Sequence, residues 1–231
     1  MAIEAVLFDY SGTLFRLEEP ALREVELTAE DGRPFDTHEV AEVMRRMTAP
    51  VEQFVTFDEA GQFAWDNRDL DPGQHRTAYL QVLEKSGVPV TSAHRLYDRL
   101  LEPLAWTPYP DTGDVLRALH ESGRRIAVVS NIAFDFRPAF TTRGWDRYVD
   151  VFTLSFEVGA MKPDPRIFRS ALDHLGIAGE NALMVGDSAE ADGGATALGC
   201  EFALVEALPT SDRPDALRAA VARHGLIPAR P

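Results

Sequence analysis

From residue 106 onward, short apolar segments alternate with amphipathic helical patterns, and this alternation constrains the fold more than any other feature. The expected strands are Ala2–Phe8, which precedes the alternating region, then Arg125–Val129, Val151–Phe156, Ala182–Val185 and Glu201–Val205. The expected helices of this region are Asp111–Glu121, Asp164–Leu175 and Pro214–His224. Such alternation predicts an α/β fold, with a Rossmann-like parallel sheet that carries helices on both faces.

The interval between residues 16 and 105 shows helical periodicity and no convincing strand. Asp36 stands three residues before Glu39, which indicates a helix start. Apolar residues then recur at helical spacing, at Val40, Val43, Met44 and Met47. Further helices are expected at Val51–Trp65, Gln74–Lys85 and Ser92–Leu101. We therefore expect residues 1–15 and 106–231 to form the core, and residues 16–105 to form a helical cap over the carboxyl ends of the strands, where open α/β sheets bind ligands.

Length, charge and cysteine content narrow the class of protein. A chain of 231 residues can form one large domain or two smaller ones. The net charge of −14 argues against nucleic acid or an anionic membrane as a partner. No apolar run approaches the roughly 18 residues of a membrane-spanning helix, and the N-terminus lacks the basic region of a signal peptide. With Cys200 as the single cysteine, these features favour the cytoplasm, while no feature indicates an oligomeric state.

Three carboxylates follow two of the apolar strands. Asp9 ends the first strand and precedes Gly12, so a rigid element would hold it as a nucleophile, although an ordinary turn cap has the same pattern. Asp187 and Asp192 lie five residues apart around a strand-to-helix turn. They could share one hard cation such as Mg²⁺ through oxygen ligands. They could equally be solvated side chains at a helix start.

Two further motifs carry hydrogen-bond donors. Ser130-Asn131 ends the second strand and could donate to a phosphoryl or carboxylate oxygen, although both residues are common in turns. Lys162 precedes Pro163 and a helix start, where its ammonium could neutralise a substrate or remain exposed. Only one sheet could bring these separated motifs together. Together they suit a metal-assisted carboxylate nucleophile that acts on a small anionic substrate.

The order of these four motifs resembles that of the haloacid dehalogenase superfamily of hydrolases, and the resemblance covers the whole chain. The segment Leu154–Phe168 is especially similar to the branch that carries a helical cap after the first strand. The resemblance implies that Asp9 is a nucleophile that forms a covalent intermediate. It also implies that Ser130 and Asn131 hold the transferring phosphoryl group and that Lys162 stabilises its charge.

The same resemblance implies a cofactor, Mg²⁺, with a defined set of ligands. Asp9, Asp187 and the backbone carbonyl of Ser11 would bind the metal, and Asp192 would support the site directly or through the lysine. Thr13 would brace the first loop by hydrogen bonding.

Ser11 departs from the pattern of the family's phosphatases, which place a second aspartate two residues after the nucleophile. That aspartate protonates the leaving oxygen and then activates water, and a serine hydroxyl has no suitable pKa for either task. Loss of a general acid–base typically costs about 10²–10⁴ in rate. The metal role would survive, because it uses a backbone carbonyl. A phosphatase would therefore need a good leaving group or an acid from the cap.

Three alternatives remain open at the level of sequence. Dehalogenases of the family also lack the second aspartate, but they use no metal, which Asp187 and Asp192 argue against. Phosphonate-cleaving relatives carry a small residue at this position and need a cap lysine, for which Lys85 is the only candidate. A non-catalytic protein could keep the fold and its anion site.

Overall fold

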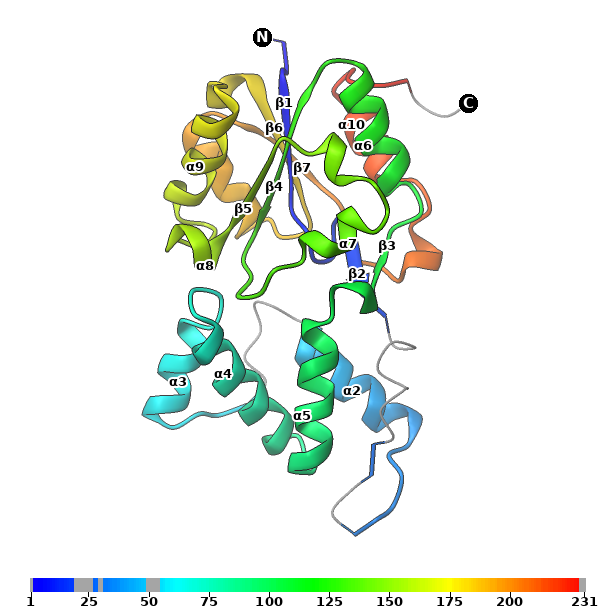
Figure 1. The fold of residues 1–231 in the computed structure, drawn as a ribbon, viewed down its shortest axis with the longest axis vertical. Coiled ribbons are helices and arrows are strands. Elements are labelled where there is room, and N and C mark those ends of the chain that lie inside the picture. Colours follow the sequence, from blue (N-terminus) through cyan, green and yellow to red (C-terminus); the bar gives the residue numbers. More distant parts are fainter. Residues whose placement is uncertain (1, 19–26, 29–30, 49–54, 229–231) are drawn as a thin grey trace.

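A five-stranded parallel sheet forms the centre of the larger domain in the computed structural model, which describes residues 2–18, 27–28, 31–48 and 55–228 (Figure 1). The strand order is β5-β4-β1-β6-β7, and all four pairings are parallel. The strands are β1 (Ala5–Phe8), β4 (Arg125–Ser130), β5 (Val151–Leu154), β6 (Ala182–Gly186) and β7 (Glu201–Leu204). The predicted α/β class is therefore confirmed.

Both faces of the sheet are buried, which explains why its strands are almost wholly apolar. Side chains alternate between the faces, so Ala5 and Leu7 pack on one side and Val6 and Phe8 on the other. The first side belongs to the cluster that contains α9 (Pro165–Leu175). The opposite cluster contains residues of α6 (Thr112–Glu121), α7 (Arg137–Thr141) and α10 (Ala216–Arg223).

Local sequence signals account for the bounds of α9. The Asp164 side chain accepts the N–H of Arg166 at 2.9 Å, and Pro165 occupies the first turn, where no N–H is needed. Gly176 ends the helix in a left-handed conformation that a glycine adopts without steric cost. Residues at its two ends therefore specify where this helix starts and where it stops.

Among the described residues, four helices form a second layer beyond the carboxyl end of β1, and we call them the cap (Figure 1). They are α2 (Thr37–Thr48), α3 (Glu59–Asp66), α4 (Pro72–Lys85) and α5 (Val90–Leu101). The start predicted at Asp36 is confirmed by a reciprocal pair of bonds. Asp36 accepts the N–H of Glu39 at 2.8 Å, and Glu39 accepts the N–H of Asp36 at 2.8 Å.

An antiparallel ribbon at the junction of the two layers was not predicted. It pairs β2 (Phe15–Leu17) with β3 (Trp106–Pro108), so the expectation of a strand-free interval is wrong at its first two residues. Each strand has three residues, too few for a period-two pattern to stand out in the sequence. The ribbon forms because the outgoing and returning chains meet there.

Several predicted bounds also differ from those in the structure, and three of these differences have consequences for the fold. The helix expected at Val51–Trp65 begins only at Glu59, because the Asp58 side chain caps it by accepting the N–H of Gly61 at 2.8 Å; residues 51–54 lie outside the described residues. The first strand begins at Ala5, not at Ala2. The strand from Val151 stops at Leu154, where α8 (Ser155–Val158) begins.

The remaining elements are short 3₁₀ turns. They are η1 (Pro103–Ala105), η2 (Asp146–Tyr148), η3 (Gly179–Asn181), η4 (Asp192–Leu198) and η5 (Thr210–Asp212). Among the described residues, none of the helices has the length and apolar character needed to cross a bilayer.

Candidate active site

The carboxyl ends of the central strands open into a cavity of about 200 Å³ between the sheet and the cap. Asp9 follows β1, Ser130 ends β4, and Asp187 follows β6. With one exception, the residues predicted for the site line this cavity, and the exception is Thr13. Parallel pairing of β1 with β4 and β6 therefore brings motifs together that are more than 170 positions apart in the chain.

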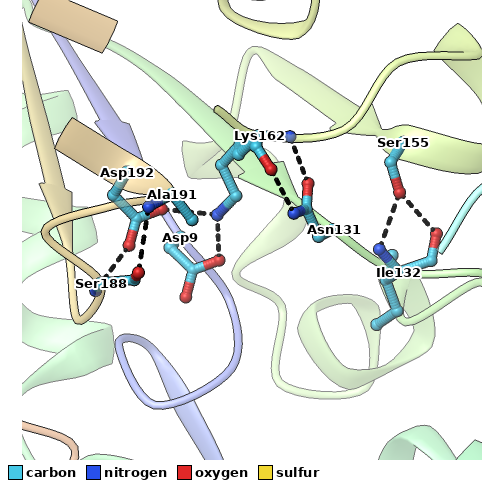
Figure 2. A network of polar contacts seen from close by, with 8 residues as sticks. All are labelled: Asp9, Asn131, Ile132, Ser155, Lys162, Ser188, Ala191 and Asp192. Carbon is cyan, nitrogen blue, oxygen red and sulfur yellow. Dashed lines mark hydrogen bonds and ion pairs between the residues drawn. The ribbon is translucent and has the colours of Figure 1, made fainter. Parts of the chain in front are cut away.

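Lys162 joins two of the carboxylates (Figure 2). Its Nζ lies 2.6 Å from Asp9 Oδ1 and 2.6 Å from Asp192 Oδ1, and all three side chains are almost completely buried. Burial alone would lower the pKa of Lys162, but Asp192 and Asp9 raise that pKa above its ordinary value. The lysine is therefore a fixed positive charge beside Asp9.

Asp192 uses both of its carboxylate oxygens within the protein. Oδ1 accepts from Lys162, and Oδ2 accepts the N–H of Ser188 at 2.9 Å (Figure 2). A Cβ atom at Gly186 would overlap this carboxylate, so the glycine at the end of β6 makes room for it. Asp192 is thus bonded to Lys162, and its carboxylate also belongs to the acidic group that could hold a metal ion.

The carboxylate oxygens of Asp9, Asp187 and Asp192 can all lie within 4.8 Å of one another. Burial raises the pKa of Asp9 to about 6, an effect that Lys162 partly offsets. Burial, together with the charges of Asp9 and Asp192, raises the pKa of Asp187 to about 7. Three carboxylates thus face one ammonium, an excess of acidic oxygen that suits a hard divalent cation.

The Asn131 side chain is paired with the main chain of Lys162, and its predicted contact with a phosphoryl group stays a prediction. Its Nδ2 donates to the carbonyl of Lys162 at 2.9 Å, and its Oδ1 accepts the N–H of Lys162 at 2.6 Å. The amide side chain is therefore already paired with the main chain of the lysine, and it positions Lys162 (Figure 2). Ser130 lines the cavity beside it and is buried, as a phosphoryl-binding hydroxyl would be.

Gly12 is required by the turn that follows the nucleophile. Its φ of 78° lies in the left-handed region, and a Cβ there would overlap the carboxylate of Asp187. Ser11 lines the cavity next to this turn, whereas Tyr10 points into the core, where its ring stacks on Phe136 with centroids 3.9 Å apart. Neighbouring residues of this loop therefore face opposite ways, Ser11 toward the cavity and Tyr10 toward the core.

Thr13 does not brace this loop with its side chain, contrary to expectation. Its hydroxyl is buried and has no hydrogen-bond partner among the described residues. The brace is Arg213, which donates to the carbonyls of Thr13, of Gly12 at 2.6 Å and of Glu206 at 2.9 Å. The guanidinium also lies 3.1 Å from the ring centroid of Tyr109. No local sequence signal marks Arg213, because it is 201 positions from Gly12.

Two cap residues that the sequence analysis missed, Arg68 and Asp69, also line the cavity. They lie in the loop between α3 and α4. The sequence marks this loop only by Asp71-Pro72-Gly73, which is typical of a turn and does not indicate a functional residue. The Arg68 guanidinium stacks 4.1 Å from the centroid of Trp65 and donates to its carbonyl at 2.6 Å. Lys85, in contrast, is exposed at the far end of α4 and does not line the cavity.

Comparisons with known proteins agree with this architecture. The family model of haloacid dehalogenase-like hydrolases matches residues 3–198. A ribulose-1,5-bisphosphate 5-phosphatase of Halopiger xanaduensis is 31% identical over 95% of this chain and 92% of its own length. A mouse haloacid dehalogenase-like hydrolase domain-containing protein 3 is 31% identical over 64% of this chain, and the match spans only 61% of that protein.

Among solved structures, the L-2-haloacid dehalogenase of Xanthobacter autotrophicus superposes with a TM-score of 0.66. That match covers 94% of this chain and 83% of the dehalogenase at 22% identity, so it is evidence of the shared fold. The family match covers most of the chain. Membership of one family therefore explains the sheet, the carboxylate cluster at its carboxyl edge and the order of the motifs. The chain belongs to the haloacid dehalogenase-like hydrolases and is an enzyme.

Proposed function

We propose that this enzyme is a Mg²⁺-dependent phosphatase that uses Asp9 as its nucleophile and acts on a small phosphorylated metabolite. One observation carries the proposal: the ammonium of Lys162 bonds both Asp9 and Asp192 at 2.6 Å, and the carboxylate of Asp187 lies in the same cluster. A buried carboxylate held beside a fixed positive charge can approach an anionic phosphoryl group that would otherwise repel it.

The residues around the cavity divide the work of phosphoryl transfer. A carboxylate oxygen of Asp9 attacks phosphorus, and the bond from phosphorus to the leaving oxygen breaks. Water later attacks the aspartyl phosphate and releases phosphate. Ser130 and Lys162 bind the equatorial oxygens throughout. Asp9, Asp187 and the Ser11 carbonyl would hold Mg²⁺, which neutralises charge on the phosphoryl oxygens when it is bound.

Size and relatives support a small phosphate ester as the substrate. The cavity measures about 200 Å³, and the cap residues Arg68 and Asp69 form part of its wall. The relative that matches nearly the full chain is, by its name, a ribulose-1,5-bisphosphate phosphatase. In the cavity, Arg68 adds a second positive charge, which suits a substrate with an additional anionic or hydroxyl group.

Hydrolysis of p-nitrophenyl phosphate with Mg²⁺ or with EDTA tests the proposal. This ester has a good leaving group, so the serine at position 11 hinders the first step least. We expect turnover that requires Mg²⁺, is lost in Asp9→Asn and is retained in Asp173→Asn, which makes the same change on an exposed surface of α9. Turnover that is insensitive to both EDTA and Asp9→Asn would remove the proposal.

A 2-haloacid dehalogenase is the second candidate, because a departing halide needs no proton and Ser11 supplies none. Release of chloride from 2-chloropropionate in the presence of EDTA, with no phosphatase activity, would favour it. Phosphonate cleavage has lost support, because Lys85 lies at the far end of a 14-residue helix, about 20 Å from the end near the cavity. Phosphate binding without turnover of any ester would indicate the non-catalytic alternative.

A further inference from the structure

If the proposed function holds, the reaction lacks a general acid in the first motif, so the cavity must supply one from elsewhere. Among the residues that the structure describes, five contribute a carboxyl group to its lining: Asp9, Asp69, Asp187, Glu190 and Asp192. The first is the nucleophile, Asp187 lies in the proposed metal cluster, and Asp192 has both oxygens engaged. Glu190 is exposed on the loop after β6. The cap residue Asp69 is the buried carboxyl that remains without an assigned role.

The main chain of Asp69 is fastened to the core domain next to the phosphoryl-binding strand end. Its carbonyl accepts the hydroxyl hydrogen of Ser155 at 2.5 Å, and the carbonyl of Ile132 shares this hydrogen at 3.0 Å. The same hydroxyl accepts the N–H of Ile132 at 2.8 Å. Ser155 directly follows β5, and Ile132 comes two residues after Ser130 on the neighbouring β4 (Figure 2). A buried contact therefore places this part of the cap against the strand end that carries Ser130.

The direction of the reaction points to the same side of the cavity. In phosphoryl transfer, the attacking and leaving oxygens lie roughly in line on opposite sides of phosphorus. Asp9 attacks from the sheet, so the leaving oxygen departs toward the cap, and Asp69 lines the cavity from the cap loop between α3 and α4. The water that later attacks the aspartyl phosphate approaches from this side as well.

The surroundings of Asp69 suit a carboxyl that exchanges a proton. The residue is 7% exposed, and its burial raises the pKa of the carboxyl, an effect that Arg68 and Lys162 partly offset. Arg68 Nε lies 3.8 Å from Asp69 Oδ2, and the guanidinium is held by Trp65, so the positive charge is fixed in place. A carboxyl whose pKa is raised by burial favours its protonated form, which is the form that can give a proton to a leaving oxygen.

We propose that Asp69 is the general acid–base of this enzyme and replaces the carboxyl that Ser11 lacks. As the bond between phosphorus and the leaving oxygen breaks, the protonated carboxyl of Asp69 gives its proton to that oxygen, and the alcohol departs. The resulting carboxylate then takes a proton from the water that attacks the aspartyl phosphate. Phosphate leaves, Asp9 is free again and Asp69 is protonated for the next cycle.

Leaving-group dependence tests this assignment, with phenyl, p-nitrophenyl and 2,4-dinitrophenyl phosphate as substrates of nearly the same shape. In Asp69→Asn we expect kcat/KM for phenyl phosphate to fall by about 10²–10³, and that for the dinitrophenyl ester by no more than about tenfold. Because the second step is also slowed, the dinitrophenyl ester should give a burst of about one phenolate per enzyme. Asp66→Asn, an exposed change three residues away, should behave like the wild type.

The double variant Ser11→Asp/Asp69→Asn provides a rescue. A carboxyl at position 11 should recover at least about tenfold of the loss on phenyl phosphate, which a merely structural role of Asp69 would not allow. Equal losses on all three esters, or no loss, would overturn the assignment while the phosphatase function stands. If wild type shows no Asp9-dependent hydrolysis of any of the three esters, the proposed function falls and the assignment falls with it.

Discussion

The affinity for a divalent cation should depend steeply on pH, because the metal must displace protons from two carboxyls. Burial raises the pKa of Asp9 to about 6 and that of Asp187 to about 7. At pH 8 both groups are ionised, and at pH 5 both are protonated. Proton competition at pH 5 then weakens binding about tenfold at Asp9 and about 100-fold at Asp187, or about 10³-fold together. That ratio corresponds to about 4 kcal/mol.

Titration calorimetry with Mg²⁺ measures this effect directly. Repeated in buffers with different ionisation enthalpies, it should show release of about two protons at pH 5, about one at pH 6.5 and almost none at pH 8. Asp187→Asn should lower the affinity and remove about one of the two protons released at pH 5, whereas Asp173→Asn should leave both unchanged. Equal affinity at pH 5 and pH 8, without proton release, would refute the claim that burial holds these carboxyls protonated.

Four further outcomes follow from the same geometry. In EDTA the melting temperature should fall as pH rises from about 4 to about 7, because Asp9 and Asp187 have folded pKa values above the ordinary 3.8. Such groups contribute stability that is full at low pH and is lost as pH rises through the folded pKa. A melting temperature that rises in calorimetric scans would contradict this. Gly12→Ala should lower the free energy of unfolding in urea by about 1–3 kcal/mol because of its positive φ, and it should also weaken Mg²⁺ binding by displacing Asp187. Gly123→Ala, with a positive φ but no neighbour within 4 Å, should leave Mg²⁺ binding unchanged. Arg213→Ala should destabilise by about 2–4 kcal/mol, because several carbonyls lose a charged donor. Ser155→Ala should increase hydrogen exchange in residues 67–71, because the bond to the carbonyl of Asp69 is lost. It should also slow phenyl phosphate hydrolysis more than dinitrophenyl phosphate hydrolysis. Equal slowing of the two would argue against a role of Ser155 in holding Asp69.

Much of the fold was predictable because its signals are local. Apolar strands that end in polar residues, a capping pair at Asp36 and Glu39, and glycine after α9 each act over a few positions, and the structure shows all three. The predictions failed where a signal was short or depended on partners. The β2–β3 ribbon has only three residues in each strand, and α3 starts at Glu59, eight residues after the predicted start.

The candidate site shows the same division between local and distant contacts. The sequence predicted that Asp9, Lys162 and Asp187 belong to one site, since each lies at a strand or helix end that a parallel sheet brings to one edge. It did not predict that the Asn131 amide pairs with the main chain of Lys162, which lies 31 positions away in the chain. Whether a side chain at such an edge faces a substrate or another loop depends on packing that no spacing rule describes.

The sequence by itself thus determined the class of fold, the edge of the sheet that carries chemistry and the gap in that chemistry at Ser11. Only the tertiary structure decided what braces the nucleophile loop and which carboxyl the cap brings to the cavity. Arg213 and Gly12 are 201 positions apart, and Ser155 and Asp69 are 86 apart. Contacts over such separations form only when the core and the cap have packed, and their residues carry no periodicity or motif beforehand.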